Sequence, residues 1–102
     1  MFHHVSAGVV ENEEGVLVDC FYRSGPQPIM LCEIGGERYL LASEPGLYGL
    51  DVWTKSARRE KDWCTATHKN TPLSSDLQRE IGRYVSEALT FCSIEHKLDI
   101  DI

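Results

Sequence analysis

The chain has 102 residues, a formal net charge of −6, 42% hydrophobic residues and 25% charged residues. These values are ordinary for a globular protein, so residues 1–102 are interpreted as a single domain with one modest core. No apolar run approaches the ~20 residues of a membrane-spanning helix, and residues 1–10 lack the basic and apolar regions of a secretory signal. We therefore expect a cytoplasmic protein with no membrane partner.

The four cysteines are widely spaced, and no C-x-x-C pair occurs: Cys20, Cys32, Cys64 and Cys92. In a reducing compartment each is expected to be a small buried apolar residue. The even number leaves a disulfide framework open as the alternative.

The first part of the chain has the composition of short strands joined by turns. Residues 5–9 alternate apolar and small residues and predict a first strand. Residues 16–22 are rich in β-branched and aromatic side chains and predict a second, with the polar run 11–15 as the turn between them.

Two apolar runs, residues 29–34 and 38–42, flank Gly35-Gly36. This pattern favours a tight hairpin, because glycine accepts positive φ at both central turn positions. Both runs are apolar at nearly every position, which indicates cover on both faces and a central place in the sheet.

Residues 43–46, SEPG, predict a turn that leads into a strand at 47–54. The charged run 55–61 is interpreted as the tip of a hairpin whose return strand is 63–68. A short helix across residues 56–63 is the alternative, and the sequence does not separate the two.

The run 71–92 is the only clear helix. Thr71 before Pro72 fits an N-cap followed by proline at N1, while Ser75 with Gln78 fits a capping box. Apolar residues recur at spacings of three and four, which is typical of one buried face: Leu77, Ile81, Tyr84, Val85, Ala88, Leu89 and Cys92. Residues 94–102 then alternate apolar and charged side chains, which predicts a half-buried strand.

These elements predict an α+β fold. We expect an antiparallel, strongly curved β-meander of about six strands packed on one C-terminal helix at about 72–92, followed by a terminal strand at about 94–102. That strand is expected to join the sheet of its own monomer; at a sheet edge it could instead pair with a second copy and form a homodimer.

No motif for catalysis, a cofactor or a metal stands out. His3 and His4 are adjacent and would point to opposite faces of a strand, and Cys64 and His68 would stand roughly 13 Å apart in a strand. Gly35-Gly36 lacks the lysine and the following helix of a phosphate-binding loop. We therefore expect no cofactor and no metal, and we interpret these residues as structural or solvated.

The charge is unevenly spread. Residues 1–54 carry eight acids and two bases (−6), residues 55–70 five bases and two acids (+3), and residues 71–102 six acids and three bases (−3). The basic island at 55–69 adjoins both tryptophans. Its candidate partner-binding residues are Trp53, Lys55, Arg58, Arg59, Lys61 and Trp63.

Three interpretations of this segment stay open: a solvated tip with both tryptophans in the core, an interface with another protein, or an edge that binds nucleic acid. The leading hypothesis is a non-enzymatic protein that binds another protein, such as an inhibitor, an immunity-type factor or an adaptor. Nucleic-acid binding through 55–69 is the second. The third is a small enzyme or ligand-binding domain with a pocket between sheet and helix, near Cys64, His68 and Tyr84.

Overall fold

The computed structural model describes residues 1–22, 29–46, 49–63 and 73–98. In these residues the chain forms seven strands and two helices, in the order β1 His3–Ser6, β2 Val9–Glu11, β3 Leu17–Asp19, β4 Ile29–Ile34, β5 Glu37–Gly46, β6 Gly49–Arg59, α1 Glu60–Trp63, α2 Ser75–Phe91 and β7 His96–Leu98. The segments 23–28, 47–48, 64–72 and 99–102 lie outside the described residues. They include Thr71, Pro72, most of the predicted strand 63–68 and the first two residues of the predicted strand 47–54.

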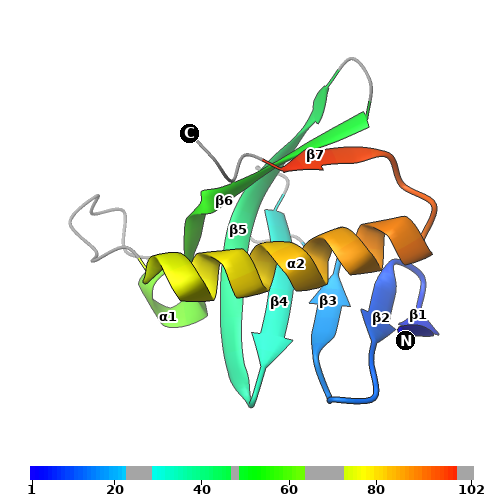
Figure 1. Cartoon of the computed structure of the whole chain (residues 1–102), viewed down its shortest axis with the longest axis horizontal. Helices are drawn as coiled ribbons and strands as arrows, with labels where there is room; N and C mark the ends of the chain where they lie inside the picture. Colours follow the sequence, from blue (N-terminus) through cyan, green and yellow to red (C-terminus); the bar gives the residue numbers. More distant parts are fainter. Residues whose placement is uncertain (23–28, 47–48, 64–72, 99–102) are drawn as a thin grey trace.

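The seven described strands form one mixed sheet with strands in chain order, curled into a half-barrel. Each of β1 to β6 pairs antiparallel with its neighbour, and only β7 pairs parallel, with β6. Helix α2 lies across one face of this sheet (Figure 1). The predicted α+β fold is therefore confirmed: a curved meander, a C-terminal helix and a final strand.

The predicted single strand at residues 5–9 is wrong, because the chain turns there. Residues 3–6 and 9–11 form the separate strands β1 and β2, which pair with each other around Ala7-Gly8. Gly8 has a φ of +76°, a backbone conformation that glycine adopts without steric cost. The predicted second strand is shorter than residues 16–22 and covers only Leu17–Asp19.

The central hairpin is confirmed. Strands β4 and β5 pair from Ile29 with Ala42 to Ile34 with Glu37, and Gly35 and Gly36 both have positive φ. Residues 43–46, however, are not a turn: β5 continues through them and pairs with β6. Pro45 and its partner Leu50 form a non-hydrogen-bonded pair of the antiparallel ladder, because the Leu50 N–H points away from β5 to the Glu95 carbonyl at 2.8 Å. The ladder with β6 therefore needs no N–H at position 45, and proline fits there.

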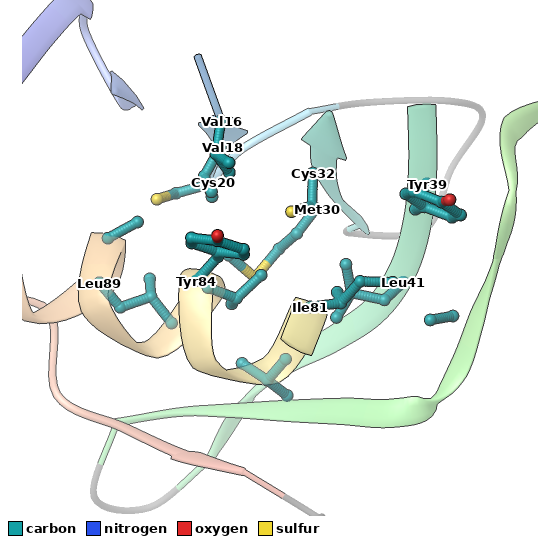
Figure 2. Close-up of a cluster of buried hydrophobic side chains, with 14 of the residues drawn as sticks. Val16, Val18, Cys20, Met30, Cys32, Tyr39, Leu41, Ile81, Tyr84 and Leu89 are labelled. Atoms are coloured by element: carbon teal, nitrogen blue, oxygen red, sulfur yellow. The ribbon is translucent and has the colours of Figure 1, made fainter. Parts of the chain in front are cut away.

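Both faces of the central strands are covered, as their continuous apolar sequence indicates. On the face toward α2, side chains such as Met30, Cys32 and Leu41 pack with Ile81, Tyr84 and Leu89 of the helix (Figure 2). On the other face, Ile29, Leu31 and Leu40 form a second buried cluster with Leu17, Tyr22 and Trp63 around it. We call this second cluster the outer cluster.

The N-cap of helix α2 lies one residue before the first residue of the predicted capping box. Ser74 is the N-cap, and its hydroxyl accepts the Leu77 N–H at 3.2 Å, so Ser75 is already helical. Gln78 does not bond back to the cap backbone but donates its side-chain amide to the Leu73 carbonyl. The predicted buried face is otherwise confirmed, with Ile81, Tyr84, Val85, Ala88 and Leu89 buried and Leu77 and Cys92 partly buried.

The chain reverses directly after α2. Ser93 has a φ of +60°, and the Ile94 N–H donates to the Leu89 carbonyl at 2.8 Å. Within the described part of the predicted strand 94–102, residues His96–Leu98 form β7, which pairs with Leu50–Val52 of β6, and residues 99–102 lie outside the described residues. The terminal strand thus joins its own sheet, as expected, at one edge.

Burial raises the pKa of the two core thiols, Cys20 and Cys32. It raises the pKa of the Cys32 thiol to about 12, and with the adjoining Cys92 thiol it raises that of Cys20 to about 12, from an ordinary 9.0. Cys20, Cys32 and Cys92 are free thiols, and Cys64 lies outside the described residues.

Stability is therefore expected to fall as pH rises from 9 to 12. In this window the unfolded chain has lost its thiol protons while the folded chain keeps them, so each pH unit costs about 1 kcal/mol per thiol. Urea unfolding at several pH values measures the slope. The Cys20→Ala, Cys32→Ala double variant should show a flatter profile; a profile parallel to the wild type would contradict this assignment.

Candidate partner-binding surface on β6 and α1

The six predicted partner-binding residues lie on β6 and α1. The interpretation of residues 55–61 as a hairpin tip is wrong, because β6 continues to Arg59 and passes directly into α1. The alternative of a helix across 56–63 is correct only for its last turn, Glu60–Trp63. Trp53, Lys55, Arg58 and Arg59 are strand residues, and Lys61 and Trp63 are helical.

A wide bulge interrupts β6 between Trp53 and Arg58. Leu40 pairs with Arg58 and Ala42 with Trp53. One residue of β5 between these two pairs therefore faces four residues of β6. The extra residues leave backbone groups without ladder partners, and side chains of the bulge itself bind them.

Ser56 and Arg58 are the residues that satisfy this bulge. The Ser56 hydroxyl accepts the Ala42 N–H at 2.7 Å and donates to the Trp53 carbonyl. Arg58 Nη1 donates to the carbonyls of Lys55 and Ala57 at 3.0 and 2.8 Å. Arg58 is thus bound to its own backbone and is not a free surface cation.

The bulge decides which side chains share a face. Trp53 and Arg58 lie opposite Ala42 and Leu40, two residues apart on β5, so both occupy the face away from α2. Arg59 lies opposite Tyr39, a residue of the core beneath α2, and forms an ion pair with Glu37 at 2.9 Å. The predicted patch therefore divides, and Arg58 and Arg59 do not form one cationic site.

Helix α1 is fixed to the outer face by polar contacts. Glu60 forms an ion pair with Arg38 at 3.1 Å and accepts the Tyr22 hydroxyl at 2.9 Å, which raises the pKa of Tyr22. Trp63, at the end of α1, is half-buried against the outer cluster.

Four residues lie on the face of the sheet away from α2, and we call them the β6–α1 surface: Trp53, Lys55, Arg58 and Trp63. Trp53 is 38% exposed, although its strand β6 has neighbouring strands on both sides. Lys55 is exposed on the same face, since burial alternates from Val52 to Lys55. Lys61 is exposed on α1.

Removing the Ser56 hydroxyl should weaken the bulge. In Ser56→Ala, the Ala42 N–H and the Trp53 carbonyl lose their partner, and we expect a loss of about 1–3 kcal/mol in unfolding free energy. Equilibrium urea denaturation measures it, with the exposed helix residue Ser75→Ala as a control expected within about 0.5 kcal/mol of wild type. Equal stability of the two variants would show that the bulge does not depend on Ser56.

The other residues considered from sequence are dispersed. His3 Nε2 lies 4.0 Å from Glu11 Oε1, and the rings of His4 and Phe91 are in tilted contact with centroids 5.0 Å apart, so the two histidines have different partners. Among the described residues no three His, Cys, Asp or Glu side chains gather as metal ligands. Cys64 and His68 lie outside the described residues.

Tyr84 belongs to the core between α2 and the sheet, and that space is filled with side chains (Figure 2). Its hydroxyl reaches the edge and donates to Glu14 at 2.9 Å, a bond that raises the pKa of Tyr84. A hollow of about 440 Å³ opens there, between α2 and the N-terminal residues. A ligand pocket between sheet and helix stays a prediction.

Sequence reasoning missed one polar pair. Ser86 on α2 and His96 on β7 lie within hydrogen-bond distance, Oγ to Nε2, at 2.8 Å. In the sequence Ser86 is one of several polar residues on the outer helix face, and His96 is one residue of an alternating strand. No spacing rule pairs them, because they meet only after the chain reverses at Ser93.

Comparisons with known proteins add no family: no protein-family model, curated protein or solved structure matches this chain. Neither helix in the described part of the chain is long and apolar enough to cross a membrane.

Proposed function

We propose that this chain is a small acidic cytoplasmic protein that binds another protein through the β6–α1 surface, as an inhibitor, an immunity-type factor or an adaptor does. The observation that carries the proposal is Trp53. Trp53 is 38% exposed on the face of the sheet that α2 does not cover, beside a bulge in which the side chains of Ser56 and Arg58 bind backbone groups. Tryptophan in such a rigid setting is a favoured hot-spot residue of protein interfaces.

The rigidity of the setting supports binding without a large ordering cost. Ser56 and Arg58 hold the bulge, and Glu60, Arg38 and Tyr22 hold α1, so Trp53 and Trp63 are presented on fixed backbone. A surface that is ordered before binding loses less conformational entropy on association. Bulges are also over-represented beside functional sites.

Charge favours a protein partner over nucleic acid. Phosphate binding needs several cations free to face the backbone of the nucleic acid. Here Arg59 is paired with Glu37 on the opposite face, and Arg58 is bound to carbonyls of the bulge. Lys55 and Lys61 are exposed as well, and two exposed cations are enough to orient an acidic patch on a protein.

The cytoplasmic part of the proposal rests on the thiols. Cys20, Cys32 and Cys92 are free, and a reducing compartment keeps thiols in that state.

A comparative capture experiment tests the surface. Immobilised wild-type protein, the Trp53→Ser, Lys55→Glu double variant and an Arg79→Glu control are each incubated with lysate of the source cells. Arg79 is exposed on α2, which covers the other face of the sheet, so the control makes the same charge change away from the β6–α1 surface. We expect a protein that wild type and control enrich and the double variant loses by about tenfold or more.

Capture of the same proteins by all three baits would contradict the proposal. Repeating the capture with purified nucleic acid over a range of salt concentrations addresses the second candidate. A steep loss of binding with salt, abolished by the double variant, would assign the surface to nucleic acid instead.

A further inference from the structure

Ser86 and His96 have the geometry of a nucleophile and its general base. His96 Nδ1 lies 3.0 Å from the Ile94 carbonyl oxygen, which can only accept a hydrogen bond. The proton of the neutral imidazole is therefore on Nδ1, and Nε2 has the free lone pair. The Ser86 hydroxyl, at 2.8 Å, then donates its proton to Nε2.

A third group orients the base, as nucleophilic catalysis by serine requires. Here it is a backbone carbonyl, held in place because the Ile94 N–H is bonded to Leu89 at the end of α2. The reversal at Ser93 and the parallel pairing of β7 with β6 fix His96 beside Ser86 of the helix. Both partners are half-buried, so water is reduced around the pair but access remains.

A groove beside Ser86 offers room for a substrate. It measures about 440 Å³, within the range of small-molecule sites, and runs along α2 opposite β7. Arg79, Arg83, Ser86, Glu87 and Thr90 line its helix side, and Leu98 lines its strand side. Ser86 is therefore one of the residues that a molecule in the groove would contact.

The groove is equipped for an anion. Arg79 pairs with Asp76 at 3.8 Å and Arg83 with Glu87 at 3.5 Å, both on the exposed helix surface. Surface pairs of this kind are weak, so a substrate anion can replace the carboxylate partner at small cost. Arg83 is also held over the Tyr84 ring at 4.4 Å, which positions its guanidinium one turn before Ser86.

We propose that Ser86 and His96 cleave a carboxylic ester whose acyl part carries an anionic group bound by Arg79 and Arg83. Ser86 Oγ forms a bond to the acyl carbon while its proton passes to His96 Nε2. The bond from the acyl carbon to the leaving oxygen breaks, and the imidazolium returns the proton to that oxygen, giving the alcohol. Water, deprotonated by the same Nε2, then attacks the acyl-serine, releases the acid and restores the Ser86 hydroxyl.

This activity uses the groove between α2 and β7, not the β6–α1 surface. A test of the activity is therefore independent of a test of partner binding. The first test is covalent. A fluorophosphonate probe incubated with the full chain should modify Ser86, located by peptide mass spectrometry. An unmodified Ser86, or labelling spread over other serines, overturns the proposal whatever the stability of any variant.

The second test is turnover of two matched esters, p-nitrophenyl hydrogen succinate and the neutral p-nitrophenyl butyrate. Ser86→Ala should lower the succinate rate by about a hundredfold. His96→Gln should lower the rate as much, because an amide is not a general base. The glutamine amide oxygen can still accept a hydrogen bond from the Ser86 hydroxyl and so keep β7 on the helix. Ser75→Ala, on the exposed first turn of α2, should match wild type.

Arg83→Gln separates the anion site from the reacting pair. It should lower the succinate rate about tenfold and leave the butyrate rate unchanged, because only the succinate ester carries a carboxylate that the guanidinium can bind. Equal effects on both esters would contradict the role of Arg83. Wild-type rates in Ser86→Ala would show that the Ser86–His96 contact only fastens β7 to the helix.

Discussion

Replacing Leu89 with alanine is expected to remove about 3 kcal/mol of unfolding free energy, a large share of the stability of a 102-residue domain. Leu89 is fully buried where α2 meets the sheet, close to Tyr84 and Cys20 (Figure 2). The loss is the sum of two terms: the hydrophobic free energy of burying the removed side-chain atoms, and the cost of the cavity that they leave. Urea denaturation followed by tryptophan fluorescence gives the free energy.

Thr90→Ala is the matched control for Leu89. It is the next residue of the same helix and is exposed, so its truncation should stay within about 0.5 kcal/mol of wild type. The difference between neighbours then reports mainly burial, since the gain in helix propensity is only a few tenths of a kcal/mol at either position. Similar losses in the two variants would mean that α2 is not packed on the sheet as described.

Gly49→Ala is expected to detach β7 and to cost about 2 kcal/mol or more. Gly49 has a φ of +140°, which a side chain rarely tolerates. A Cβ there would also lie 2.7 Å from the Glu95 carbonyl carbon and collide with the carbonyl oxygen. That oxygen accepts the Leu50 N–H, the hydrogen bond at the start of the contact between β6 and β7.

Hydrogen exchange tests this prediction locally. In Gly49→Ala the amides of Leu50 and of His96–Leu98 should lose protection, while those of the β4–β5 hairpin keep it. Gly35→Ala is the control: its φ of +57° carries strain, but a Cβ there meets nothing within 4 Å. It should cost about 1 kcal/mol and leave β7 protected. Unchanged protection of β7 in Gly49→Ala would contradict the described register.

Local patterns explain why much of the fold could be predicted. The helix follows from apolar residues at spacings of three and four, and the central hairpin from two apolar runs around Gly35-Gly36. The alternation after residue 94 predicts a strand but not its partner, because period two is the same for parallel and antiparallel pairing. The parallel pairing of β7 with β6 depends on where the reversal at Ser93 directs the chain.

The bulge in β6 is the feature that local patterns miss. Charged residues at 55–61 resemble a loop, yet Ser56 and Arg58 bind the backbone groups that the bulge leaves unpaired, so the strand continues. One of these bonds reaches Ala42 on another strand, a partner that no local window contains. For the same reason the sequence joins Arg58 and Arg59 in one patch, whereas the structure places them on opposite faces.

The central claim is that Trp53 lies in a protein interface. Its most direct test places a photoreactive benzophenone side chain at position 53, and in a second protein at position 79, on the exposed face of α2. After irradiation in lysate, the proposal predicts one dominant covalent adduct from position 53, which unlabelled wild-type protein competes away, and none from position 79. No adduct at position 53, or the same adducts from both positions, would contradict it.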